Sequence, residues 1–181
     1  MRKAAGLLVA CSLLVPVGAI VAGSAGAAAS ATTSCKTLTG KEVYSPALPK
    51  LGGKPLTSTV TTNSKLGGCV GGGVTSANVV SKTTYKGDCA TFLAGFGKPT
   101  LGTAKITWNT GKTSSVATTL TSITKAGVNP ALAKLVSKFT AGLFVGHTST
   151  VEIKATAATG SCTKVGLAGF TFVNDGLFKN S

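Results

Sequence analysis

The chain has 181 residues, of which 18 are Lys or Arg and only 4 are Asp or Glu, so its formal net charge is +14. It contains a single histidine and a single tryptophan, and aromatic residues make up 6% of the sequence. So few acids and histidines argue against most enzyme mechanisms that need paired carboxylates, an imidazole base or a cluster of metal ligands.

The N-terminal segment has the organisation of a secretory signal peptide. Arg2 and Lys3 precede an apolar run over 7–22, and residues with small side chains follow over 23–31. This order of a positive, an apolar and a small-residue region predicts a cleaved signal peptide over 1–29.

Cleavage is expected between about 27 and 31, which leaves a single secreted domain over 30–181. An uncleaved membrane anchor is one alternative, but the apolar run is shorter than the ~20 residues that span a bilayer. We therefore expect no transmembrane segment after cleavage. A lipid attached to Cys11 is a second alternative, because the residues around Cys11 resemble a lipobox.

The remaining sequence is rich in Thr, Val, Gly and Ser, a composition typical of β-sheets. Short strand-like runs are separated by Gly, Pro and Asn. The runs are 36–44, 57–66, 73–85, 101–109, 113–123, 147–155 and 163–173. They predict an all-β fold, an antiparallel sandwich or barrel of about seven to nine strands with one short helix, stapled by two disulfides.

Alternation of apolar and polar residues indicates which strand faces are dry. The apolar residues that share one face are Ala104, Ile106 and Trp108 in one run, and Val151, Ile153 and Ala155 in another. Residues 109–112 predict a tight hairpin in which Gly111 adopts a positive φ. Near the C-terminus, Leu167 and Phe170 have opposite parity, so Gly169 is expected to mark a bulge.

One segment has helical periodicity. Asn129 can cap a helix and Pro130 suits its first position. The apolar residues that follow at helical spacing are Leu132, Leu135, Val136 and Phe139. We expect a helix over 129–139 that plugs the open end of the β core, or alternatively a lid over a ligand cavity. Asp88 is expected to cap a second, shorter turn over 89–93.

Four cysteines follow the predicted signal peptide, and an even number in an exported chain indicates two disulfides. Cys35 opens the first strand-like run and Cys69 follows the second. If these runs pair antiparallel, the two cysteines lie side by side, which favours Cys35–Cys69 and leaves Cys89–Cys162. A zinc site is the alternative, but no two cysteines have CxxC spacing.

Two groups of residues have the chemistry of a hydrolase but lack its motifs. His147 would need Asp88 or Asp175 and a serine to form a triad, and the sequence has no G-x-S-x-G elbow. Glu42 and Glu152 resemble a pair of glycosidase carboxylates, but both occupy strand positions that we expect to face solvent. We therefore expect no catalytic, cofactor-binding or metal site.

Other residues that could bind ligands have structural interpretations. The glycine-rich segment 67–73 lacks the helix that a phosphate-binding loop requires, so we expect a flexible turn beside a disulfide. Trp108 is expected in the core rather than on a stacking platform. Tyr44 and Tyr85 end strands and are expected at the rim.

The mature region resembles a group of small, uncharacterised secreted β proteins from actinobacteria. The resemblance rests on turn and disulfide motifs over 35–40, 68–75, 107–112 and 142–144. It implies export and an all-β fold, and it implies no activity. By comparison with these proteins, the segment 129–137 is predicted to be an additional helix.

The function we expect is that of a non-enzymatic extracellular or cell-envelope-associated module with a basic surface. Its lysines would meet anionic envelope polymers or lipid head groups. Specific nucleic-acid binding is not expected, because the basic residues after the predicted signal are all lysine and aromatics are not interleaved with them. A small apolar-ligand carrier with a cavity in the β core is one alternative, and a hydrolase is another. The oligomeric state stays open.

Overall fold

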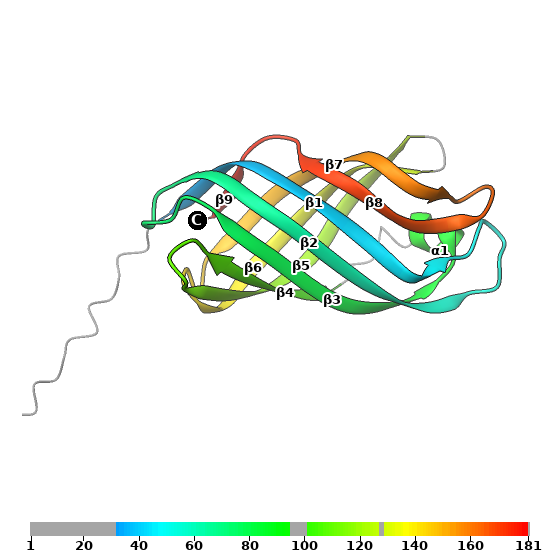
Figure 1. Cartoon of the computed structure of the whole chain (residues 1–181), viewed down its shortest axis with the longest axis horizontal. Helices are drawn as coiled ribbons and strands as arrows, with labels where there is room; N and C mark the ends of the chain where they lie inside the picture. Colours follow the sequence, from blue (N-terminus) through cyan, green and yellow to red (C-terminus); the bar gives the residue numbers. More distant parts are fainter. Residues whose placement is uncertain (1–31, 95–100, 127–128, 181) are drawn as a thin grey trace, which may run out of the picture.

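The computed structural model describes residues 32–94, 101–126 and 129–180, which form a β-barrel with a short helix at one end (Figure 1). In chain order the elements are β1 (Thr33–Leu48), β2 (Leu56–Val70), β3 (Ala77–Gly87), α1 (Cys89–Ala94), β4 (Leu101–Trp108), β5 (Thr113–Ala126), β6 (Asn129–Gly142), β7 (Thr148–Ser161), β8 (Gly166–Asn174) and β9 (Phe178–Asn180). The predicted all-β antiparallel fold with one short helix and two disulfides is confirmed.

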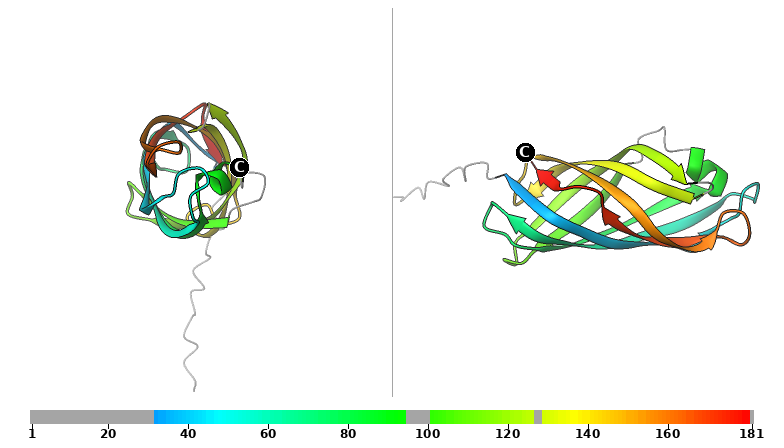
Figure 2. Two further views of the ribbon diagram at one scale, coloured as in Figure 1. Left: turned by 90° about the vertical axis from the view of Figure 1, so that its right-hand side faces the viewer. Right: turned by 90° about the horizontal axis from the view of Figure 1, so that it is seen from above.

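The barrel closes because β1 pairs with both β2 and β8. Each strand from β1 to β8 pairs antiparallel with the next, so these strands form an eight-stranded up-and-down ring. The short β9 pairs with the beginnings of β1 and β7. The view along the axis shows the strands arranged as a ring (Figure 2, left). The sequence left a sandwich and a barrel open, and the structure is a barrel.

All seven predicted strands are present; β1, β2, β5 and β7 are longer than expected, whereas β3, β4 and β8 are shorter. The hairpin over 109–112 joins β4 to β5, with Gly111 at a φ of 79° and its amide bonded to the carbonyl of Trp108 at 2.9 Å. The register between β7 and β8 shifts next to Gly169, which confirms the bulge.

The helix predicted over 129–139 is wrong, because this segment is strand β6. β6 pairs along its length with β5 and β7, and its backbone hydrogen bonds therefore run to neighbouring strands. Its buried Phe139 has the same parity as Ala133, Leu135 and Ser137, which line the barrel interior. Leu132 and Val136 have the opposite parity to these inward residues. Because both parities of β6 carry apolar residues, the segment also satisfies the spacing of a helix.

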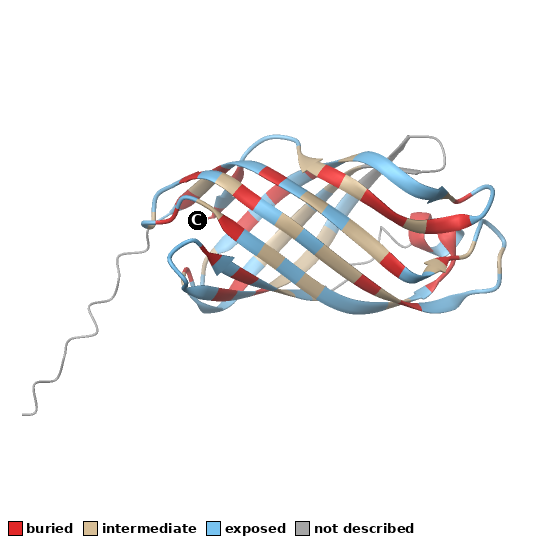
Figure 3. Ribbon diagram, viewed as in Figure 1, coloured by how far each residue is buried: buried red, intermediate tan, exposed pale blue. Residues whose placement is uncertain are grey.

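Buried and exposed residues alternate along the strands, as Figure 3 shows on β1, β2 and β3. The predicted dry faces of β4 and β7 both point inward, with Ile106, Trp108, Val151 and Ile153 buried. Every lysine whose side chain is described is exposed. The barrel thus has a lysine-rich outer face and an inner face that forms the core.

Aromatic side chains fill the end of the barrel where β4 turns into β5 and β6 into β7. The ring of Phe144 lies edge-on to those of Trp108 and Phe139, with centroids 5.1 and 6.0 Å away. The Trp108 indole donates to Ser114 Oγ at 2.9 Å, and the Ser114 hydroxyl donates to the carbonyl of Leu143. We call the cluster of Trp108, Phe139 and Phe144 the packed end; it confirms that Trp108 is a core residue.

The opposite end is covered by α1, which matches the short turn predicted after Asp88. The Asp88 carboxylate accepts hydrogen bonds from the amide of Thr91 at 2.8 Å and from its hydroxyl at 2.6 Å. These bonds satisfy donors at the first turn of the helix. Phe92, on the same helix, is buried at the mouth of the barrel.

Each end of the barrel carries one disulfide. Cys35 and Cys69 are direct partners in the register of β1 and β2 and form one bond, as the antiparallel pairing of the first two strands requires. Cys89 bonds to Cys162 and ties the start of α1 to the turn between β7 and β8. Two disulfides are typical of proteins that fold in an oxidising compartment.

The signal peptide predicted over 1–29, its cleavage zone and Cys11 lie outside the described residues. Among the residues that are described, no helix is long and apolar enough to cross a membrane.

Candidate functional site

A cavity of about 490 Å³ occupies the middle of the barrel, between the packed end and α1. It exists because many inward positions at this level carry small side chains where a filled barrel would carry large ones. These positions include Ser64, Ser81, Gly102, Ala104, Ala133 and Ser149. The volume falls within the range of cavities that hold drug-sized ligands.

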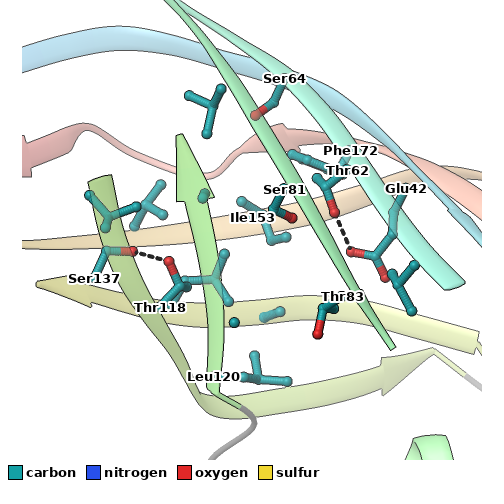
Figure 4. A pocket seen from close by; sticks show the side chains of 18 of the residues that line it. Glu42, Thr62, Ser64, Ser81, Thr83, Thr118, Leu120, Ser137, Ile153 and Phe172 are labelled. Atoms are coloured by element: carbon teal, nitrogen blue, oxygen red, sulfur yellow. Dashed lines mark hydrogen bonds between the residues drawn. The ribbon is translucent and has the colours of Figure 1, made fainter. Parts of the chain in front are cut away.

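The cavity wall is apolar with a minority of hydroxyl groups. Leu135, Val151 and Ile153 of β6 and β7 supply part of the apolar surface. Thr118 and Ser137 are hydrogen-bonded to each other at 2.8 Å across β5 and β6 (Figure 4). Such a wall suits a mostly apolar molecule that is oriented by a few polar groups.

Glu42 is the acid in this wall, and its position corrects the expectation that it faces solvent. It lies on β1 between the inward residues Gly40 and Tyr44, and its carboxylate points into the barrel (Figure 4). One oxygen accepts a hydrogen bond from the hydroxyl of Tyr44, and the other accepts one from Thr62 Oγ1 at 3.2 Å. The parity shared with buried Leu38 and Tyr44 is the signal in the sequence that places Glu42 inside.

Burial raises the pKa of Glu42 above its ordinary value of 4.5, and the hydrogen bonds from Tyr44 and Thr62 offset part of this effect. The part of the side chain that is accessible faces the cavity rather than bulk water. In the described chain the one ion pair joins Lys134 to Glu152, at 3.9 Å on the outer surface. Glu42 is therefore an acid in a largely apolar interior with hydroxyl partners but without a cation.

Three aromatic rings line the cavity where it meets α1, and one of them, that of Phe92, belongs to the helix itself. Phe92 packs edge-on against Tyr44 and Tyr85, with ring centroids 5.5 and 5.8 Å away. Burial, together with the nearby Glu42 carboxylate, raises the pKa of Tyr44 well above its ordinary value. Tyr85 is half-buried, and its hydroxyl has no hydrogen-bond partner among the described residues. Tyr44 and Tyr85 thus lie near the mouth, as predicted, but they face inward.

The residues predicted for a hydrolase are not brought together. His147 lies in the turn between β6 and β7, against the ring of Phe144, and its Nδ1 has no partner within the described ranges. Asp88 caps α1 at the other end of the barrel. Glu152 lies on the outer face of β7, as expected, whereas Glu42 lies inside.

Two other candidate sites can be assessed from the described residues. These contain no group of three or more His, Cys, Asp or Glu side chains that could hold a metal ion. In the segment 67–73, for which a turn was expected, residues 67–70 belong to β2 and include Cys69, and only 71–73 lie in the connection to β3. The interior cavity is therefore the strongest candidate for a functional site.

No protein-family model, curated protein or solved structure matches the chain. The cavity and the charged surface are consequently the features from which a function is inferred.

Proposed function

We propose that the protein binds a small, mostly apolar molecule inside its barrel and carries it outside the cytoplasm without chemical change. The observation that carries this proposal is the cavity of about 490 Å³ between the packed end and α1. An eight-stranded barrel is just wide enough either to be filled by its side chains or to hold one small ligand. The small side chains at this level support the second outcome.

The cost of the cavity supports the same conclusion. An unfilled apolar space forfeits packing contacts that larger inward side chains would supply, and cavities lower stability roughly in proportion to their volume. Large side chains can fill a barrel of this width, because Trp108 and Phe139 do so at the packed end. A ligand that occupied the space would restore the missing contacts and stabilise the folded state.

Native mass spectrometry of the freshly secreted protein tests this proposal. We expect a population heavier than the polypeptide by the mass of one small molecule, which organic solvent releases. The matched control is Gly102→Phe, because a side chain added at Gly102 would enter open cavity. Wild-type protein that carries no ligand and takes up no added apolar molecule would contradict the proposal.

A basic envelope-associated module is the second candidate, and the outward-facing lysines favour it. All lysines with described side chains are exposed, against a total of 4 acids in the chain. Binding to anionic liposomes or isolated cell wall, titrated with salt, tests this role. Binding at low ionic strength that weakens as salt is added would support it, since salt screens exposed charges. Absence of binding at low ionic strength would count against it.

A further inference from the structure

Among the lining residues that the structure describes, Glu42 carries the one acidic group, and none of them is a lysine or arginine. The neighbouring inward residues across the sheet are Thr62 and then Ser81, because Glu42 pairs with Thr62 and Thr62 pairs with Ser81. The next two residues along the same row are Ala104 and Val116, which are apolar. The row therefore begins with a carboxylate and two hydroxyls and ends with apolar side chains.

We propose that the ligand is an apolar amine whose protonated nitrogen pairs with Glu42 and whose hydrocarbon part lies along the apolar wall of β6 and β7. This inference rests on the proposed function, because it assigns a chemical class to the molecule in the barrel. The polar row of Glu42, Thr62 and Ser81 forms the head-group site (Figure 4).

The hydrogen bonds of Glu42 favour a cationic partner. Both carboxylate oxygens already accept bonds from hydroxyl donors of the protein, which stabilises the ionised form. An ionised carboxylate can accept about four hydrogen bonds. The carboxylate of Glu42 can therefore accept further hydrogen bonds from a ligand on the side that faces the cavity. A buried carboxylate without a cation is costly, and an ammonium group would supply the missing charge.

Other head groups fit this site less well. A carboxylate ligand would meet the like charge of Glu42 in a medium of low dielectric. An alcohol could donate a hydrogen bond, but it would leave the charge of Glu42 unpaired. An ammonium group has three donors, and the hydroxyl oxygens of Thr62 and Ser81 are the acceptors next to Glu42 in the row.

The positive charge of the chain does not exclude a cationic ligand. The lysines with described side chains lie on the outer face of the barrel, in contact with water. At physiological ionic strength their field is screened over about 8 Å. The pairing with Glu42 takes place inside the barrel, where a single charge pair is much stronger than in water.

Three probes of equal chain length test this inference at pH 7: decylamine, decanol and decanoic acid. Each is titrated calorimetrically into wild-type protein and into Glu42→Gln. The matched control is Glu152→Gln, which removes the same charge from the outer face of β7. We expect wild-type protein and Glu152→Gln to bind decylamine roughly ten- to hundred-fold more tightly than decanol, as a charge-assisted hydrogen bond would give. Glu42→Gln is expected to lose this preference.

The outcomes separate the inference from the proposed function. If decanol binds but decylamine binds no more tightly, or if Glu42→Gln retains the preference, the assignment of an amine is wrong while the cavity still binds apolar molecules. If decanoic acid binds best, the assignment is also wrong. If no probe binds wild-type protein, the proposed function itself fails.

A second variant keeps the test usable if Glu42→Gln does not fold. Thr62→Val removes one hydroxyl next to the carboxylate and keeps the shape of the side chain. We expect it to reduce the preference for decylamine by about two- to ten-fold, the effect of one hydrogen bond. An undiminished preference in a folded Thr62→Val protein would overturn the head-group site.

Discussion

The packed end and the cavity are built from the same strands and differ in the size of the side chains that point inward. β4 contributes Trp108 to the packed end and Gly102 to the cavity, at positions of the same parity. β6 likewise contributes Phe139 to one and Ala133 to the other. The hollow is thus specified by side-chain volume rather than by the topology of the barrel.

Because the two regions differ in packing, we expect one to contribute mainly to the stability of the fold and the other mainly to ligand binding. The packed end is closed by aromatic packing and a disulfide between β1 and β2, whereas the cavity leaves inward surfaces without partners. We expect substitutions at the packed end to lower the free energy of unfolding strongly and substitutions in the cavity wall to change ligand binding more than stability.

The largest expected effect is that of Trp108→Ala. This change removes a fully buried ring and its hydrogen bond to Ser114, and we expect a loss of about 3–5 kcal/mol in the free energy of unfolding. Leu135→Ala, in the half-buried cavity wall, is expected to cost about 1 kcal/mol. Urea denaturation followed by circular dichroism measures both. Equal losses would show that the two regions are equally packed.

The same substitution at two inward glycines shows how the space inside the barrel varies around the cavity itself. A Cβ at Gly40 would lie 2.6 Å from Cβ of Ser64 and overlap the ring of Phe172, whereas a Cβ at Gly102 would meet no atom within 4 Å. We therefore expect Gly40→Ala to lose about 1–3 kcal/mol and Gly102→Ala to be nearly neutral. Thermal unfolding of the two variants gives the answer, and a destabilised Gly102→Ala would argue against open space at that position.

A smaller effect is expected at the helix that covers the cavity. Hydrogen bonds from the hydroxyl and amide of Thr91 lower the pKa of Asp88 below its ordinary value of 3.8. This stabilisation is present above pH 3.8 and is lost as the pH falls through the lowered pKa. Asp88→Ala should cost about 1 kcal/mol at pH 7, as the loss of a helix cap does, and less in acid. A pH-independent difference between the proteins would show that the carboxylate does not cap α1.

The smallest effect, and one of opposite sign, is expected at Glu42. Because burial raises the pKa of Glu42, the unfolded state ionises first as the pH rises above 4.5, and the folded state is then penalised. Glu42→Gln removes this penalty, so the ligand-free variant should gain stability relative to wild type between pH 4 and pH 7. Unfolding curves at the two pH values measure the change. A relative loss would mean that the wild-type carboxylate stabilises the empty barrel.

The strands could be predicted from the sequence because their two faces differ in polarity. Over 104–108 of β4 and 150–155 of β7 the inward residues are apolar and their outward neighbours are polar, so parity identifies the dry face. In β6 both faces carry apolar residues, and a short segment of this kind also satisfies a helical period. The helical caps Asn129 and Pro130 strengthened the wrong interpretation, although β6 in fact pairs with two strands.

The cavity could not be predicted in the same way. Parity shows that Ser81, Gly102 and Ala104 share their faces with core residues, but it does not show that they lie at one level of a closed ring. That information is carried by the cross-strand register, which the sequence specifies only through many weak pairings. The tendency of acids in strands to face water predicts Glu42 on the outer face, yet its parity with Leu38 and Tyr44 favours the interior.

Calorimetric titration of decanol at several temperatures tests the central claim most directly, that the middle of the barrel is hollow and accepts an apolar molecule. We predict saturable binding of one molecule per chain, with a negative heat-capacity change that marks burial of apolar surface. Folded Gly102→Phe, in which the added ring occupies the cavity, should not bind. No binding by wild-type protein, or equal binding by both proteins, would contradict the account.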